Sequence, residues 1–131
     1  MPLERINPTG LAAGGAYTHV VVAQPGRLVF VSGQVGLDSE GQLVGEGDVV
    51  AQARQAFSNL ITALHAAGAS PDDVTKVTIF VAGYSPESME GIRAARREAF
   101  GDVLPASTFL GVQSLARPEF LIEVEAVAAI A

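Results

Sequence analysis

The sequence has no cysteine, no tryptophan and only two histidines. Without cysteine the chain has no disulfide bond, no thiolate nucleophile and no thiolate-bound metal. With so few histidines, a zinc site would need carboxylates to complete its set of ligands. Long apolar runs are also missing, because no stretch approaches the roughly 18 residues that a membrane-spanning helix requires. We therefore expect neither a metal centre nor a membrane segment.

Charged residues are scarce, and most of them are acidic. The 8 basic and 14 acidic residues give a net charge of −6, which disfavours binding to a nucleic-acid backbone. The start of the chain lacks the apolar core of a secretory signal, so we expect a cytoplasmic protein. A chain of 131 residues that is 49% hydrophobic is expected to form one domain, residues 1–131, and to bury surface by self-association.

Two apolar runs near the start, residues 17–24 and 27–32, are rich in residues that favour strands. They are separated by Pro25-Gly26, and the pattern predicts a β-hairpin. The glycine-rich segment that follows, residues 33–47, is expected to be a loop with a short strand at 42–44.

Apolar residues at three- and four-residue spacing then predict two helices. The first begins at an Asp48 N-cap and ends at Gly68, and the second begins at Ser85-Pro86-Glu87 and runs to about Phe100. The polar face of the first helix is expected to carry Gln52, Gln55, Asn59 and Thr62. The later strands are expected at residues 74–82, 106–115 and 121–128.

The resulting order, β-β-α-β-α-β-β, predicts an α+β fold with both helices packed on one face of a mixed sheet. The other face of the sheet still carries apolar residues, such as alternate positions of residues 74–82. A second subunit is the simplest cover for that face, which agrees with the expected self-association.

Small and polar residues at the first two predicted strands form one candidate site. Tyr17 follows Gly14-Gly15, and Ser32 and Gly33 end the second run. A glycine lets a ligand approach the backbone, and a serine adds a hydroxyl group. These residues fit either an ordinary sheet and turn or the mouth of a pocket.

Two carboxylates interrupt the last predicted strand. Glu123 and Glu125 are two residues apart, so both project from the same face of the strand. A carboxylate in a central strand is costly to bury unless it is paired. The pair either lies on a hydrated face or contacts arginines, or else supplies a general acid or base in a cleft.

Arginines interrupt the apolar stripe of the second predicted helix. Arg93 and Arg96 follow Met89 and Ile92 at four-residue spacing, so both fall on or beside the stripe. Each guanidinium either extends to water on its apolar stem or binds an anionic ligand in a pocket or subunit interface. The two histidines, by contrast, have no partner at a spacing typical of metal ligands or catalytic triads.

Taken in order, several short motifs resemble the RidA/YjgF family of reactive intermediate deaminases over nearly the whole chain. The resemblance rests on Gly15-Ala16-Tyr17, Val31-Ser32-Gly33-Gln34, residues 51–56 (AQARQA), residues 77–81 (VTIFV), Pro105-Ala106 and residues 122–128 (IEVEAVA).

This resemblance implies a chorismate-mutase-like α+β fold. It also implies a homotrimer whose sheets surround a central barrel, with pockets between the subunits. Active members of the family hydrolyse enamines or imines to a keto acid and ammonia without a cofactor. In them an arginine holds the substrate carboxylate, and a glutamate and backbone groups place the attacking water.

By position, Tyr17, Ser32, Gly33 and Glu123 match pocket residues of the family. The chain departs from the family where active members read Pro-Ala-Arg, because it carries Ser107 after Pro105-Ala106. A serine hydroxyl cannot replace a bidentate guanidinium, so we expect weak activity on simple 2-imino acids. Phe109 stands where many members have cysteine. Arg93 is the residue expected to supply a cation instead, and Arg117, just before Pro118, is a second candidate.

Two functions remain open. The first is a cofactor-free hydrolase or deaminase of small enamines or imines, with Glu123 as the catalytic residue. The second is a non-catalytic trimer that binds or senses small carboxylates. Glu123 favours the first function, whereas Ser107 and Phe109 favour the second.

Overall fold

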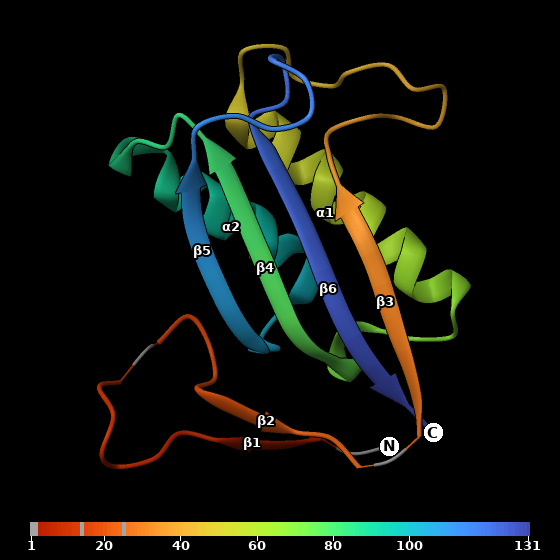
Figure 1. The fold of residues 1–131 in the computed structure, drawn as a ribbon, viewed down its shortest axis with the longest axis vertical. Coiled ribbons are helices and arrows are strands. Elements are labelled where there is room, and N and C mark those ends of the chain that lie inside the picture. Colours follow the sequence, from red (N-terminus) through yellow and green to blue (C-terminus); the bar gives the residue numbers. More distant parts are fainter. Residues whose placement is uncertain (1–2, 14, 25) are drawn as a thin grey trace.

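The protein is described here by a computed structural model that covers residues 3–13, 15–24 and 26–131. A mixed sheet in the order β3-β6-β4-β5 forms one layer, and helices α1 and α2 form the other, behind the sheet in Figure 1. The elements of this body are β3 (Arg27–Gln34), α1 (Val49–Ala66), β4 (Val74–Ala82), α2 (Met89–Phe100), β5 (Ala106–Val112) and β6 (Ile122–Ile130). The predicted α+β fold is therefore confirmed, with β5 parallel to β4 and β6 antiparallel to both neighbours.

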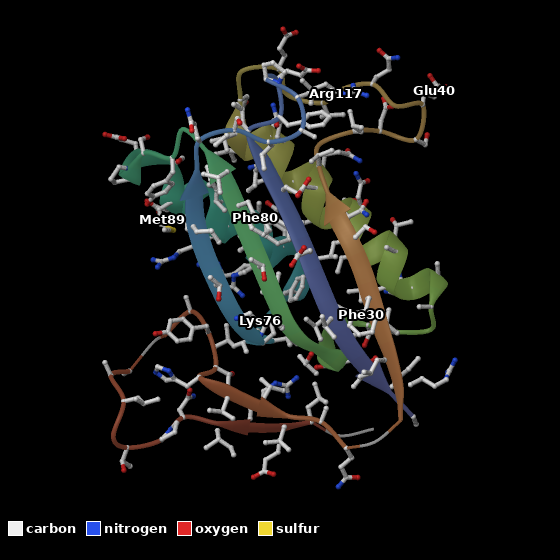
Figure 2. The ribbon with its side chains drawn as sticks, viewed as in Figure 1. Phe30, Glu40, Lys76, Phe80, Met89 and Arg117 are labelled. Atoms are coloured by element: carbon white, nitrogen blue, oxygen red, sulfur yellow. The ribbon has the colours of Figure 1, made fainter. Side chains whose placement is uncertain are left out.

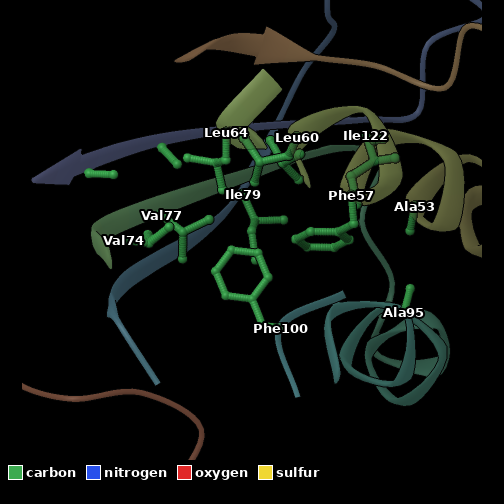
Figure 3. Close-up of a cluster of buried hydrophobic side chains, with 14 of the residues drawn as sticks. Ala53, Phe57, Leu60, Leu64, Val74, Val77, Ile79, Ala95, Phe100 and Ile122 are labelled. Carbon is green, nitrogen blue, oxygen red and sulfur yellow. The ribbon is translucent and has the colours of Figure 1, made fainter. Parts of the chain in front are cut away.

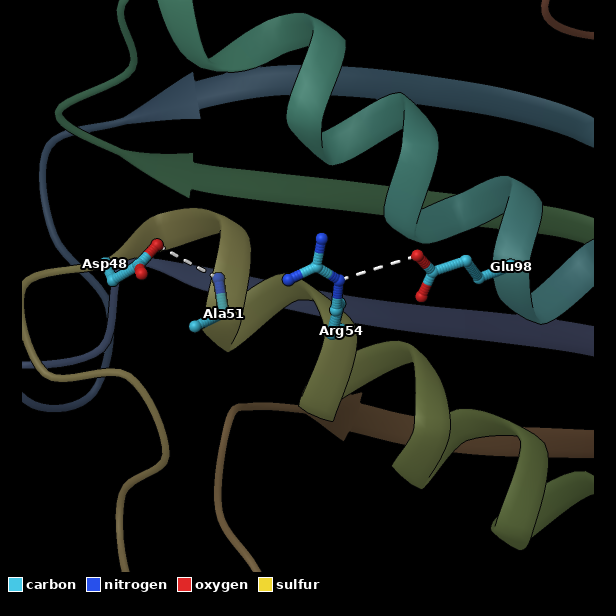
Figure 4. Close-up of polar contacts among 4 residues, drawn as sticks. All are labelled: Asp48, Ala51, Arg54 and Glu98. Atoms are coloured by element: carbon cyan, nitrogen blue, oxygen red, sulfur yellow. Dashed lines mark hydrogen bonds and ion pairs between the residues drawn. The ribbon is translucent and has the colours of Figure 1, made fainter.

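Helix α1 begins and ends as its sequence predicts. The Asp48 side chain accepts hydrogen bonds of 3.1 Å from the backbone nitrogens of Val50 and Ala51, which satisfies donors that the helix leaves free. Figure 4 shows the bond from Ala51. At the other end Gly68 adopts a φ of 79°, a conformation that glycine reaches without steric cost. The cap and the glycine together fix the length of this helix.

One polar residue of α1 is not on its surface, contrary to the sequence expectation. Gln52 is fully buried, and its amide nitrogen donates to the carbonyls of Gly45 and Glu119, both at 3.0 Å. Its oxygen accepts from the backbone nitrogen of Leu121 at 2.8 Å. The side chain therefore ties α1 to the loop before it and to the start of β6, and this role explains why an amide tolerates burial.

The hydrophobic core lies between the two helices and the sheet (Figure 3). Phe57 of α1 meets Phe100 of α2 edge to face, with ring centroids 6.2 Å apart. Burial alternates along β4 and β6, so every second residue faces the helices. The residues between them face away from the helices, and Glu123 is one of these.

The predicted N-terminal hairpin is wrong. Strand β2 (Val20–Val22) pairs with an unpredicted strand, β1 (Glu4–Ile6), in a separate two-stranded sheet. Strand β3 instead pairs with β6 at the edge of the main sheet. A turn motif between two apolar runs does not decide their partner, because pairing also depends on distant residues. Pro25 and Gly14 lie outside the described residues.

Smaller differences concern the ends of elements. Residues 42–44 form no strand, only a single bridge between Leu43 and Leu37. A short 3-10 turn, η2 (Pro86–Ser88), precedes α2, so the proline begins this turn and not the α-helix itself. A second such turn, η1 (Pro71–Asp73), leads into β4.

The face of the sheet that lacks helices carries large apolar side chains. Phe30 is 73% exposed and Leu28 is 59% exposed, and both belong to β3. Figure 2 shows Phe30 and Phe80 on this side of the sheet, together with Lys76. The sequence predicts helices on one face only and an apolar opposite face, and the structure confirms both. We call this surface the open face.

Candidate functional site

A cavity of about 380 Å³ lies where α2 meets the edge strand β5 and the segment before β2. Its polar lining comes from Tyr17, Arg93, Arg96, Ser107 and Thr108. Its apolar lining comes from Ala16, Ile79, Met89, Ile92 and Phe109. No carboxylate is among these lining residues. We call this space the α2 cavity.

The parallel pairing of β4 and β5 places two of the predicted site residues in the α2 cavity. Ser107 lies beside Val77 and Phe109 beside Ile79, and neighbours in a ladder share a face of the sheet. Because Val77 and Ile79 face the core, Ser107 and Phe109 face α2. Phe109 also packs edge to face on Tyr84, with ring centroids 5.3 Å apart, which fixes its ring at the cavity wall.

Two arginines of α2, Arg93 and Arg96, line this cavity. Arg93 is exposed and lines the cavity. Arg96 is only 7% exposed, and its Nη1 atom is buried without a hydrogen-bond partner among the described residues. Burial lowers the pKa of the Arg96 guanidinium, and the positive charges of Arg97 and Arg93 lower it further. The group remains charged, because an arginine is not deprotonated in proteins.

Three other predicted site residues lie together elsewhere, where β3 ends and the neighbouring strand β6 begins. The Glu123 carboxyl group packs directly on Gly33, since a Cβ atom built on that glycine would lie 2.6 Å from Cδ and 2.7 Å from Oε2. Glu123 pairs with Phe80 of β4, so it belongs to the face away from the helices. Ser32 is exposed next to Gly33, where the register between β3 and β6 shifts. We call these three residues the Glu123 group.

The single chain therefore separates the predicted site into two parts. Tyr17, Arg93, Ser107 and Phe109 line the α2 cavity, whereas Ser32, Gly33 and Glu123 lie on the opposite side of the sheet. Neither part alone has all the groups that a hydrolytic site needs. One part has cations and hydroxyls but no base, and the other has a carboxylate but no enclosing wall.

Other residues singled out by sequence have structural surroundings. Arg117 Nη1 lies 3.9 Å from Glu119 Oε1, its guanidinium lies over the ring of Phe120, and it does not line the α2 cavity. His19 contacts the carbonyl of Ala12 at 2.6 Å and packs against Tyr17. Within residues 3–13, 15–24 and 26–131 there is no cluster of side chains suited to a metal ion, and no helix has the length and hydropathy to cross a bilayer.

Comparison with known proteins decides the family. The description of the family whose pattern matches residues 8–130 is endoribonuclease L-PSP. The chain belongs to this family, also called RidA/YjgF. A mouse member named 2-iminobutanoate/2-iminopropanoate deaminase is 39% identical over 118 residues, covering 89% of this chain and 83% of the relative.

Solved RidA/YjgF structures share the fold. A Rid-family protein from Yersinia pestis, YyfB, superposes with a TM-score of 0.93 at 37% identity, covering 99% of this chain and 100% of the other. TdcF from E. coli, solved with bound serine, superposes with a TM-score of 0.71 at 27% identity, covering 91% of each chain. The resemblance stated from the sequence is thus confirmed for both family and fold.

The contact between Gly33 and Glu123 yields a test of the Glu123 group. In Gly33→Ala the new methyl group would overlap the Glu123 carboxyl group. The carboxyl group is the far end of a flexible side chain, so it is expected to swing aside while the sheet stays folded. We expect unchanged thermal unfolding and an at least about tenfold loss of any reaction that needs Glu123 as a base, measured as kcat/KM. Serine at position 33 is expected to act like alanine, and wild-type activity in either variant would contradict the placement.

Proposed function

We propose that this protein hydrolyses small enamines or imines to a carbonyl compound and ammonia, in pockets between the subunits of a homotrimer. The observation that carries the proposal is the Glu123 carboxylate held against the Gly33 backbone, in a strand whose other residues except Glu125 are apolar. Relatives that bear the name 2-iminobutanoate/2-iminopropanoate deaminase support this reaction class. The serine-bound TdcF structure supports a ligand of small size.

A trimer would unite the two parts of the site. The α2 cavity lies at the β5 edge, and the Glu123 group lies on the open face. In a closed ring each interface joins two different surfaces, so one subunit's cavity would face the next subunit's Glu123 group. Such packing would also bury Phe30 and Leu28, which are otherwise exposed.

In this site Glu123 acts as the general base. Its carboxylate takes a proton from a water molecule as the water oxygen attacks the imine carbon, and the carbon–nitrogen double bond becomes single. The same proton then passes to the nitrogen, which gives a carbinolamine. Glu123 next takes the proton of the new hydroxyl group and passes it to the nitrogen, so that the carbon–nitrogen bond breaks and ammonia leaves as the carbonyl forms. The backbone N–H of Gly33 and the hydroxyls of Ser32 and Tyr17 are the polar groups available to orient the reacting atoms.

Ser107 leaves the β5 wall without a cation, so we propose that 2-iminopropanoate is a poor substrate. Arg93 on the facing wall supplies the cation of the α2 cavity in its place. The same Ser107 favours the second candidate, a non-catalytic trimer that binds carboxylates through the α2 cavity.

A competition assay separates the two candidates. Imines are generated from a panel of amino acids by an amino acid oxidase, and semicarbazide traps whatever is not hydrolysed. We expect the protein to lower the semicarbazone yield for at least one imine, with 2-iminopropanoate among the least affected. No acceleration with any imine of the panel would leave the carboxylate-binding trimer as the function.

A further inference from the structure

The two cations of the α2 cavity have no negative partner among the described residues. Arg93 and Arg96 are three positions apart on α2, so they project side by side from one face of the helix. Both line the α2 cavity, and no carboxylate does. Within the described residues the ion pairs are Arg54 with Glu98, shown in Figure 4, and Arg117 with Glu119, and neither includes these arginines.

Arg96 makes this arrangement costly in the free protein. More than nine-tenths of the residue is buried, and its Nη1 atom lacks any hydrogen-bond partner in the described part of the chain. A buried charge without a counterion is strongly unfavourable, and the neighbouring charges of Arg93 and Arg97 oppose it further. An anion bound in the cavity would supply the missing counterion and would also offset the repulsion between the neighbouring arginines.

Neutralising both Arg93 and Arg96 requires a ligand with more than one negative charge. A single carboxylate paired with one guanidinium in two parallel hydrogen bonds leaves the other guanidinium without a counterion. Arg96 lies at the buried end of the pair and Arg93 at the exposed end, so two anionic groups of one ligand can be bound in line. Ile79, Met89 and Ile92 supply an apolar wall for a short carbon chain between those groups.

We infer that the α2 cavity is a two-cation subsite that selects dicarboxylic ligands, namely 2-imino acids with an acidic side chain and the 2-oxo acids that they yield. This inference rests on the proposed function for the link to imines, but the binding preference stands on the two arginines alone. It also accounts for an arginine-free β5 wall, because the cations that hold the substrate come from α2.

Calorimetric titration with two matched ligands tests the inference at low ionic strength. 2-Oxoglutarate and 2-oxopentanoate have the same five-carbon backbone and differ in the terminal carboxylate. We expect 2-oxoglutarate to bind at least about tenfold more tightly, the scale of one hydrogen-bonded charge pair. In Arg96→Gln the two ligands are expected to bind within about threefold of each other.

Arg54→Gln is the matched control, because it removes the same charge from an exposed position of α1. It is expected to keep the preference for 2-oxoglutarate. If Arg96→Gln fails to fold, Arg93→Gln at the exposed end of the pair gives the second measurement and is expected to lower the preference as well.

Three results would overturn the inference. Equal binding of the two oxo acids by the wild-type protein would show that one cation or none is available, as when a carboxylate of a second subunit occupies the cavity. Tighter binding of phosphoglycolate than of 2-oxoglutarate would assign the cavity to phosphate esters. A preference unchanged in both arginine variants would place the site elsewhere. Imine hydrolysis without a preference for dicarboxylic ligands would reject this inference but not the proposed function. A preference for dicarboxylic ligands without imine hydrolysis would reject only the proposed function.

Discussion

Glu123→Gln is expected to lower kcat for imine hydrolysis by about two to four orders of magnitude, the range found when a general base is lost. The amide has the same shape as the carboxylate, so it still fits against Gly33, but it cannot accept a proton from water. Because the change leaves the α2 cavity untouched, KM for the substrate is expected to change little. The semicarbazide assay measures the rate, and thermal unfolding confirms that the variant is folded.

Glu125→Gln is the control for this effect. Glu125 lies two residues further along β6 and on the same face, and it pairs with Thr78 without contacting Gly33. Its loss removes the same charge from the same strand and is expected to leave the rate within about twofold of wild type. A Glu123→Gln variant that retains most of its activity would reject Glu123 as the base.

Phe30→Glu is expected to convert the proposed trimer into monomers. Phe30 is the most exposed large apolar side chain of the described residues, at 73%, and it lies on the open face that a partner would cover. A charge buried there without a counterion would cost several kcal/mol at each interface, and a trimer would bury it three times over. Light scattering is expected to give a mass near 13.5 kDa for the variant and about three times that for the wild type.

Loss of assembly is also expected to abolish hydrolysis, since the two parts of the site lie on opposite sides of one chain. Leu11→Glu is the control, because Leu11 is an exposed apolar residue outside the main sheet. It is expected to remain trimeric and active. A wild-type protein of monomeric mass, or an active Phe30→Glu monomer, would contradict the proposed assembly.

Local features of the body of the fold could be predicted because they depend on neighbouring residues. Asp48 and Gly68 set the ends of α1 through backbone hydrogen bonds and a positive φ, and both signals are readable in the sequence. The alternation along β4 likewise predicts its two faces. The pairing of β2 with β1 could not be predicted, because β1 has three residues and no periodic pattern.

The site was harder to predict than the fold, because the positions of its residues depend on contacts between distant parts of the chain. The spacing of apolar residues predicts which helix face Arg93 occupies, and in the structure that face borders the α2 cavity. Arg96 has the same spacing signal, but its burial in the folded chain depends on tertiary packing, which no local pattern records. The sequence predicts a surface position for Gln52 because an amide is usually hydrated, whereas three backbone groups hold it inside.

The separation of the α2 cavity from the Glu123 group makes subunit exchange informative about catalysis. A chain that lacks the carboxylate still contributes an intact cavity, and a chain with a damaged cavity still contributes an intact carboxylate. In the proposed trimer, mixing the two inactive chains would give hybrid assemblies in which some interfaces unite the two intact parts. Complementation between dead variants is thus a property that this fold would confer, and a site held within one chain would not.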